Sequence, residues 1–101
     1  MLPSDPPSTV AGNRAIVTVI GHDQVGIIAA VATMLAQAQV NILDISQSIM
    51  QEFFVMIMMV DLAKSSGGFD ALKAQLNAQG ESMGLKIDIQ REDVFKLMHR
   101  V

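Results

Sequence analysis

Residues 16–47 read IVTVIGHDQVGIIAAVATMLAQAQVNILDISQ, and this stretch predicts a strand, a helix and a second strand in succession. Residues 14–21 are short, rich in β-branched side chains and end in glycine, which is typical of a strand. Residues 25–38 contain five alanines and place Ile28, Val31, Ala32 and Leu35 at helical spacing on one face, which predicts a helix with one deeply buried side. Residues 41–50 alternate between apolar and polar types, as a half-solvated edge strand does.

The rest of the chain continues this pattern. Residues 53–62 are apolar on both faces until Asp61, which predicts a central strand. Residues 69–83 read as a second helix that ends raggedly at its glycines, and residues 85–90 alternate like a second edge strand. Residues 92–101 predict a short amphipathic helix, with acids at its start and bases near its end.

The order of these elements predicts an α+β fold. Strand, helix, strand, strand, helix, strand is the order of a ferredoxin-like βαββαβ sandwich. The first and third strands are apolar on both faces, so they belong in the middle of an antiparallel sheet ordered 4-1-3-2, with a short C-terminal helix after it. Two helices cover only one face of such a sheet. A second copy of the chain or the tail helix could cover the other face.

Length and composition favour one domain that associates with itself. A chain of 101 residues suits a single domain, which we place at 14–101, after a Pro-, Ser- and Gly-rich segment, 1–13, that we predict to be disordered. Hydrophobic residues make up 50% of the chain and charged residues 17%, against about 25% charged in a typical domain. Self-association is the simplest use of the extra apolar surface. The eight methionines fit core filling better than a flexible interface.

Several functional classes are excluded. Without cysteine, the chain has no disulfide framework, thiolate metal site or cysteine nucleophile. Its formal net charge is −3 and its basic residues are scattered, which argues against direct nucleic-acid binding. The apolar runs at 27–32 and 53–60 are too short to span a bilayer. The start has no signal-peptide pattern, so we expect a cytoplasmic protein with no membrane association.

The turn between the first strand and the first helix is the first candidate binding site. Asp23 stands where a helix N-cap would be, and the free backbone N–H groups of a helix start favour a ligand carboxylate. Gly26 would allow close approach, and Asp23 could instead receive an ammonium group. The simpler interpretation is that Asp23 only caps the helix and Gly26 only eases packing.

Asn41 and Asp44, at the start of the second strand, form the second candidate. An asparagine side chain offers one acceptor and two donors to a ligand, although an asparagine after a helix is also a common turn residue. His22 and His99 lie in distant segments, so we predict no metal site. No serine has a nucleophile-elbow context and no nucleotide-binding glycine pattern is present. We therefore expect no catalytic residues, no cofactor and no enzyme activity.

The stretch quoted above resembles the start of an ACT domain, a small-ligand regulatory module. The family pattern is a strand, Asp-x-x-Gly-(Ile/Leu), a helix and then Asn-Ile-x-Asp. It is matched by Asp23, Gly26, Ile27, Asn41, Ile42 and Asp44. The ending, GLKIDIQREDVFKLMHRV, resembles a narrower group of standalone single-domain ACT proteins related to the glycine cleavage system transcriptional regulator. The resemblance covers 14–101.

This resemblance implies a homodimer that binds an amino acid at its subunit interface. One wall of the implied site comes from the first-strand turn, and the other comes from the partner's second strand. Carried over to this chain, the walls are His22, Asp23, Val25, Gly26 and Ile27 on one side, and Asn41 and Asp44 on the other. Some amino-acid-binding members have asparagine in place of Asp23, and an acid there repels a ligand carboxylate. Any regulated protein would be a separate chain.

Two hypotheses of function follow. In the first, the chain is a dimeric module that senses an amino acid or a similar small polar metabolite. In the second, its apolar sheet face and methionine-rich third strand dock a partner enzyme or transcription factor without any small ligand.

Overall fold

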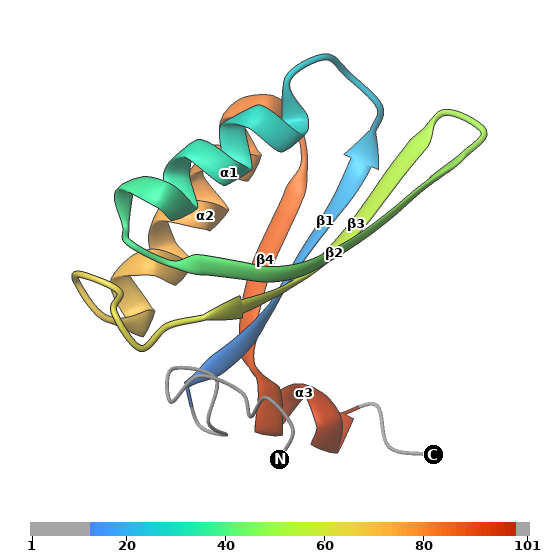
Figure 1. The fold of residues 1–101 in the computed structure, drawn as a ribbon. Helices are drawn as coiled ribbons and strands as arrows, with labels where there is room; N and C mark the ends of the chain where they lie inside the picture. The colour runs from blue at the N-terminus through green and yellow to red at the C-terminus, as the bar shows by residue number, and fades with distance from the viewer. Residues whose placement is uncertain (1–12, 99–101) are drawn as a thin grey trace.

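A computed structural model describes residues 13–98 as one four-stranded sheet with two helices packed on one face and a third at its end (Figure 1). The predictions for residues 1–12 and 99–101 lie outside the described residues. The elements in chain order are β1 (Arg14–His22), α1 (Ile27–Gln37), β2 (Asn41–Met50), β3 (Phe53–Asp61), α2 (Phe69–Met83), β4 (Lys86–Arg91) and α3 (Glu92–Met98).

The sheet has the predicted topology. Its strands are ordered β2-β3-β1-β4 and every neighbouring pair is antiparallel, which is the order 4-1-3-2 counted from the other edge. The two strands that are apolar on both faces, β1 and β3, are the central ones, as their sequences require. The α+β class and the βαββαβ order are therefore confirmed.

The core lies between the sheet and the two long helices. Alternate residues of β1 and β3 point toward α1 and α2. The buried side chains of this layer include Val17, Val19, Met56, Met58, Val31, Leu35, Leu72 and Leu76. Met56 and Met58 fill this layer, which fits the prediction that methionine serves as core filler. Ile28, predicted to lie on the buried stripe of α1, is instead 40% exposed, because the stripe is centred on Ile27 and Val31.

The first helix starts later than its sequence suggests. The prediction that Asp23 caps it is wrong, because Gly26 is the N-cap and the carbonyl of Gly26 accepts the first helical hydrogen bond, from Ala30 N–H. Gly26 takes φ 92°, a left-handed conformation that is strained for residues with a side chain. Asp23 stands three residues earlier and its own N–H donates to the carbonyl of Glu52.

A β-bulge in β2 changes which of its side chains share a face. Simple alternation groups Leu43 with Ile45, Gln47 and Ile49, and that grouping is wrong at its first member. Ile42 lies opposite Val60 and Ile45 opposite Met58, with the register shift between Ile42 and Asp44. The extra residue turns both Ile42 and Ile45 toward the helices, because each bulge reverses the alternation once.

The connection between β2 and β3 is a two-residue turn, so the predicted hairpin is confirmed. It has neither Asn-Gly nor any glycine. Gln51 adopts φ 58° in place of the usual glycine, which costs roughly 1 kcal/mol for a residue with a side chain. The nine paired positions of β2 and β3 supply the compensating contacts.

The close approach of α2 to β4 depends on Gly80. The predicted helix 69–83 is confirmed, and it ends at Gly84 in the left-handed region, so Gly84 but not Gly80 marks its end. A Cβ at Gly80 would lie 2.7 Å from the carbonyl oxygen of Leu85 and 3.1 Å from the backbone nitrogen of Ile87. Both contacts are with backbone, which cannot rotate away.

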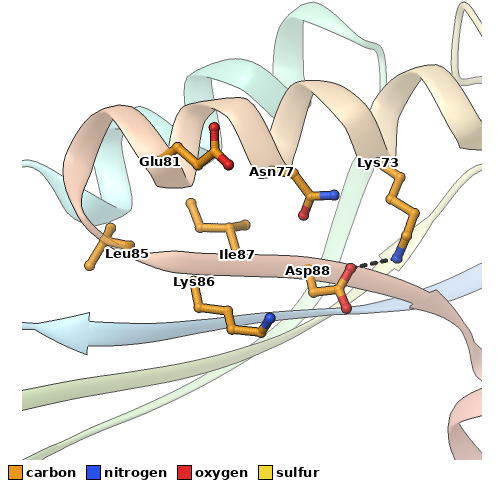
Figure 2. A pocket seen from close by; sticks show the side chains of 7 residues that line it. All are labelled: Lys73, Asn77, Glu81, Leu85, Lys86, Ile87 and Asp88. Carbon is orange, nitrogen blue, oxygen red and sulfur yellow. Dashed lines mark hydrogen bonds and ion pairs between the residues drawn. The ribbon is translucent and has the colours of Figure 1, made fainter.

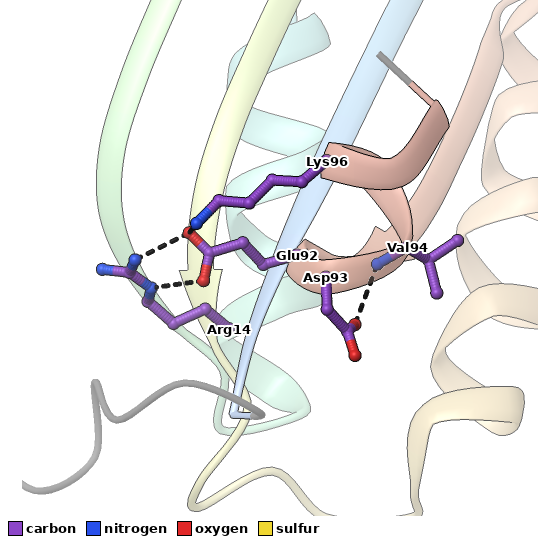
Figure 3. A network of polar contacts seen from close by, with 5 residues as sticks. All are labelled: Arg14, Glu92, Asp93, Val94 and Lys96. Carbon is purple, nitrogen blue, oxygen red and sulfur yellow. Dashed lines mark hydrogen bonds and ion pairs between the residues drawn. The ribbon is translucent and has the colours of Figure 1, made fainter. Parts of the chain in front are cut away.

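The short helix α3 begins with a buried acid. Glu92 is 7% exposed, and its carboxylate accepts two hydrogen bonds from the Arg14 guanidinium, at 3.0 and 2.6 Å, with Lys96 at 3.8 Å (Figure 3). The predicted apolar face of this helix is partly wrong. Helical spacing predicts that Val94, Leu97, Met98 and Val101 share this face. The first three are exposed, Val101 lies outside the described residues, and Phe95 and Met98 line the groove against the sheet.

The outer edge of β4 carries an ion pair with α2. The Lys73 ammonium lies 2.5 Å from the Asp88 carboxylate and also donates to the carbonyl of Ile89 (Figure 2). Burial raises the pKa of Asp88. The hydrogen bonds from Lys73 and from Ile89 N–H, with the charges of Lys73 and Lys86, outweigh burial and hold that pKa below its ordinary value.

We expect Gly80→Ala to destabilise the fold by about 1–3 kcal/mol, because the new methyl group overpacks against the backbone of β4. Helix propensity alone predicts the opposite sign, a gain of about 1 kcal/mol. Urea denaturation followed by circular dichroism measures the difference. Ser82→Ala, an exposed change on the same helix, is the control and should shift the midpoint little. A stabilised Gly80→Ala variant would contradict the close approach.

We expect Asp88→Asn to lower the free energy of unfolding at pH 7 by about 0.5–1 kcal/mol, the range for a partly exposed ion pair. A lowered pKa means that the ionised carboxylate stabilises the native state above its unfolded value of about 3.9, and that this contribution is lost as pH falls further. Denaturation curves from pH 7 to pH 3 should therefore converge for the two proteins below about pH 4. A difference that is constant over this range would contradict the assignment.

Candidate functional site

The turn after β1 is attached to the far end of the β2–β3 hairpin. His22 ends β1 and its ring lies 5.1 Å from that of Phe53, tilted by 33°. The N–H of Asp23 donates to Glu52 at 2.9 Å. These two contacts place the His22 ring and the exposed Asp23 carboxylate together at one end of the sheet.

The second half of the turn is held by a residue that the sequence analysis did not single out. The Gln24 side chain donates to the carbonyl of Met83, the last residue of α2, at 2.9 Å. Val25, between this anchor and Gly26, is 100% exposed. A Cβ at Gly26 would have no atom within 4 Å, so the space above the glycine is open. The turn is therefore fixed at its base and accessible at its tip.

This turn leads into a helix start without a side-chain cap. Helix α1 has 11 residues, and no side chain among the described residues accepts a hydrogen bond from its first turn. The free N–H groups there and the positive end of the helix dipole favour a carboxylate ligand. Ile27 contributes only its backbone to this surface, because its side chain is 2% exposed and belongs to the core.

Asn41 and Asp44 lie at the opposite end of the sheet from this turn. Asn41 pairs with Asp61, and Asp61 pairs with Arg14 at the start of β1, whereas His22 ends the same strand. Eight residues of strand separate the two groups, or roughly 27 Å. Within one chain the two predicted walls therefore do not meet.

Asn41 instead lines a small pocket with residues that the sequence analysis missed. The pocket has a volume of about 290 Å³ and its walls are Gln39, Asn41, Asp61 and Lys64. Asp61 is 2% exposed. One of its carboxylate oxygens accepts the N–H of Ala63, and the other has no hydrogen-bond partner among the described residues. A buried polar atom without a partner is costly and is a known mark of functional positions.

The sequence did contain a signal for Asp61. It is the one charged residue in an otherwise apolar strand, and the sequence analysis used it only to mark the strand's end. Asp61 lies beside Arg14 and Asn41 on the neighbouring strands, and a linear pattern does not show that arrangement.

Asp44 stands apart from this pocket. It is exposed and follows the bulge in β2, where one of its carboxylate oxygens accepts the N–H of Ile45 at 2.9 Å. Its position opposite Met59 places it on the face of the sheet that α1 and α2 leave open. Asp44 therefore faces outward from a single chain.

The described residues offer few other candidate sites for a metal or a ligand. Within residues 13–98, no three acidic or histidine side chains gather as metal ligands would, and His99 lies outside this range. Over the same residues, no helix combines the length and apolar character needed to cross a bilayer. A groove of about 460 Å³ between α2 and β4 contains none of the predicted residues, and the charge of Lys73 in it is already paired (Figure 2).

The chain has relatives that it matches over nearly their whole length. A UPF0237 protein of Clostridium acetobutylicum is 53% identical over 88 residues, which is 87% of this chain and 99% of that protein. A UPF0237 protein of Methanocaldococcus jannaschii is 46% identical over 89 residues, which is 88% of this chain and 99% of the relative.

Solved structures and a family model agree with these relatives. An ACT domain protein from Streptococcus pneumoniae superimposes with a TM-score of 0.72 at 36% identity, covering 82% of this chain and 93% of that one. A proposed glycine cleavage system transcriptional repressor shares the fold, with a TM-score of 0.69 at 23% identity over 77% of this chain and 44% of that one. A family model described as an ACT domain matches residues 13–90. The chain therefore belongs to the ACT domain family.

Proposed function

We propose that this chain is a non-catalytic regulatory module that binds a small polar metabolite, an amino acid, as a homodimer. Membership of the ACT family supports a ligand-binding role. The observation that carries the proposal is the uncapped start of α1, which opens beside the exposed Val25 and the unobstructed Gly26. Free N–H groups next to open space are suited to a ligand carboxylate.

The two ends of the sheet offer complementary chemistry to a zwitterion. The start of α1 offers backbone N–H donors to a carboxylate. The other end offers the acids Asp44 and Asp61, which suit an ammonium group, and the amide of Asn41, which both donates and accepts. An α-amino acid carries both charges, so it uses both groups of residues.

A homodimer is needed to bring these groups together. They lie roughly 27 Å apart in one chain, which is longer than any amino acid. A two-fold axis that reverses the strand direction brings the Asn41 end of one copy's sheet to the His22 end of the other's. In this proposal His22, Asp23, Val25, Gly26 and the backbone of Ile27 come from one chain, and Asn41 and Asp44 come from its partner.

We recognise no group of catalytic residues among residues 13–98. In this proposal the module therefore regulates a separate protein. Ligand binding would change the surface that the dimer presents to this protein. The matched region makes up 99% of two relatives, so in those proteins the domain stands without a further one.

Thermal unfolding against each common amino acid at millimolar concentration tests the proposal. A ligand at about 100 times its dissociation constant adds roughly 2.7 kcal/mol. The unfolding midpoint should then rise by on the order of 10 °C for one or two amino acids. Asp23→Ala, which removes a carboxylate that can bind the ligand's ammonium group, and Asn41→Ala should each remove most of this rise.

Asn77→Ala is the matched control for Asn41→Ala, because it removes an exposed amide from the groove beside β4. It should retain the full rise. Loss of the rise in Asn77→Ala alone would move the ligand to that groove and contradict the proposed site. A flat panel for the unmodified protein would contradict amino-acid binding and favour the docking module, whose regulated partner needs no small ligand.

A further inference from the structure

Helix α3 stands at one end of the sheet and forms a groove with it, here the α3 groove (Figure 1). The groove has a volume of about 230 Å³ and lies between Phe95 and Met98 of α3 and side chains of β1 and β4. The family model ends at residue 90, whereas α3 spans Glu92–Met98. One wall of the groove therefore lies outside the residues that the family model matches.

The floor of the α3 groove includes a block of four side chains on two neighbouring strands. Thr18 on β1 lies directly opposite Asp88 on β4, and Ile16 lies directly opposite Gln90. Directly opposite residues of an antiparallel pair have Cβ atoms about 4.5–5.5 Å apart and point to the same side of the sheet. Three groups that accept hydrogen bonds, one each from Thr18, Asp88 and Gln90, therefore gather beside one apolar side chain.

One of these acceptors has no hydrogen-bond donor. The side-chain Oε1 of Gln90 is buried and has no partner within residues 13–98. Buried polar atoms in native proteins are nearly always hydrogen-bonded, so an exception calls for a physical explanation. Because Gln90 lines the α3 groove, a molecule bound there can supply the missing donor.

The carboxylates at the α3 groove already have cationic partners. Asp88 is paired with Lys73 on α2, and Glu92, the first residue of α3, is paired with Arg14 (Figure 2, Figure 3). A charged ligand would lose its hydration in this groove without gaining an unpaired counter-charge, which is costly. The groove is therefore suited to an uncharged molecule.

The remaining walls favour an apolar body of limited size. Ile20 on β1 and Met98 on α3 both line the groove and are exposed, so a bound molecule would remove their apolar surface from water. A cavity of about 150 Å³ lined by apolar side chains holds benzene. The larger volume of the α3 groove accommodates a fused pair of aromatic rings.

We propose that the α3 groove is a binding site for a small, uncharged, mainly apolar molecule that carries one hydrogen-bond donor. The donor binds Oε1 of Gln90, and the apolar body lies between the sheet at Ile16 and Ile20 and the side chains of Phe95 and Met98 on α3. All the groups that the molecule needs belong to a single chain.

This site is separate from the amino-acid site of the proposed function. None of the residues that line the α3 groove belongs to the turn at 22–27 or to the pair Asn41 and Asp44. The two sites also select opposite chemistry, because an amino acid carries two charges and the α3 groove favours none. Either proposal can therefore fail without the other.

Indole and benzofuran are the probes that test this site. The two fused rings have nearly the same shape, but only indole has an N–H group to donate. The chain has no tryptophan or tyrosine, so indole fluorescence can be followed without a protein background. We expect indole to bind the full chain, and benzofuran to compete for the same site about 10-fold more weakly, because it leaves Oε1 of Gln90 without a donor.

Gln90→Met removes the acceptor and keeps the length of the side chain. It should weaken indole binding about 10-fold and leave benzofuran binding unchanged, so that the two affinities become nearly equal. The variant also removes a buried acceptor without a donor, so its thermal midpoint should stay or rise, which separates lost binding from lost folding. Gln47→Met, the same change at an exposed position of β2, is the matched control and should retain the preference for indole.

A second variant tests the groove itself. Thr18→Leu fills its floor and keeps Gln90, so it should weaken both probes at least about 10-fold. Equal affinity of the unmodified protein for the two probes, or no indole binding at millimolar concentration, would overturn the proposal. Indole binding that Gln90→Met leaves unchanged would place the probe elsewhere and overturn it as well. Binding seen only after deletion of residues 99–101 would make the chain's own end the occupant of the groove, which also overturns the proposal.

Discussion

The rest of this structure depends on one constraint, which is that two helices cover one face of a four-stranded sheet. Burial of β1 and β3 against α1 and α2 provides the core and therefore most of the stability. The same central strands also carry apolar side chains on their other face, where Ile20, Phe53 and Ile57 are 48%, 43% and 43% exposed. The fold thus produces a second apolar surface that it cannot bury alone.

Polar groups gather where this layered core ends. At one end, the turn after β1 is fastened by Asp23 to the hairpin and by Gln24 to α2, and it opens onto the start of α1. At the other end, Asp61 is buried with one oxygen lacking a hydrogen bond among the described residues, beside Asn41. The sheet separates two chemically complementary groups, the backbone N–H groups at the start of α1 and the acids and amide near Asn41. This separation suits a site shared between two copies.

Much of the architecture was predictable, because strands buried on both faces and strands buried on one face have different residue patterns in the sequence. The β1 and β3 segments lack polar alternation, the β2 and β4 segments have it, and these patterns alone give the strand order. The site was only partly predictable. Asp23 and Gly26 were found as a motif, whereas Gln24 and Asp61 act through neighbours that are distant along the chain.

The sequence by itself determined the class of fold, the central and edge strands and the family, since these follow from local periodicity and short motifs. Only the tertiary structure decided the helix start at Gly26, the bulge that turns Ile45 toward the helices, and the orientation of α3. The bulge and the place of α3 involve contacts between segments remote in sequence, which are β2 with β3 and Arg14 with Glu92. The physical reason is that periodicity reports which residues are buried, whereas long-range pairing decides what they are buried against.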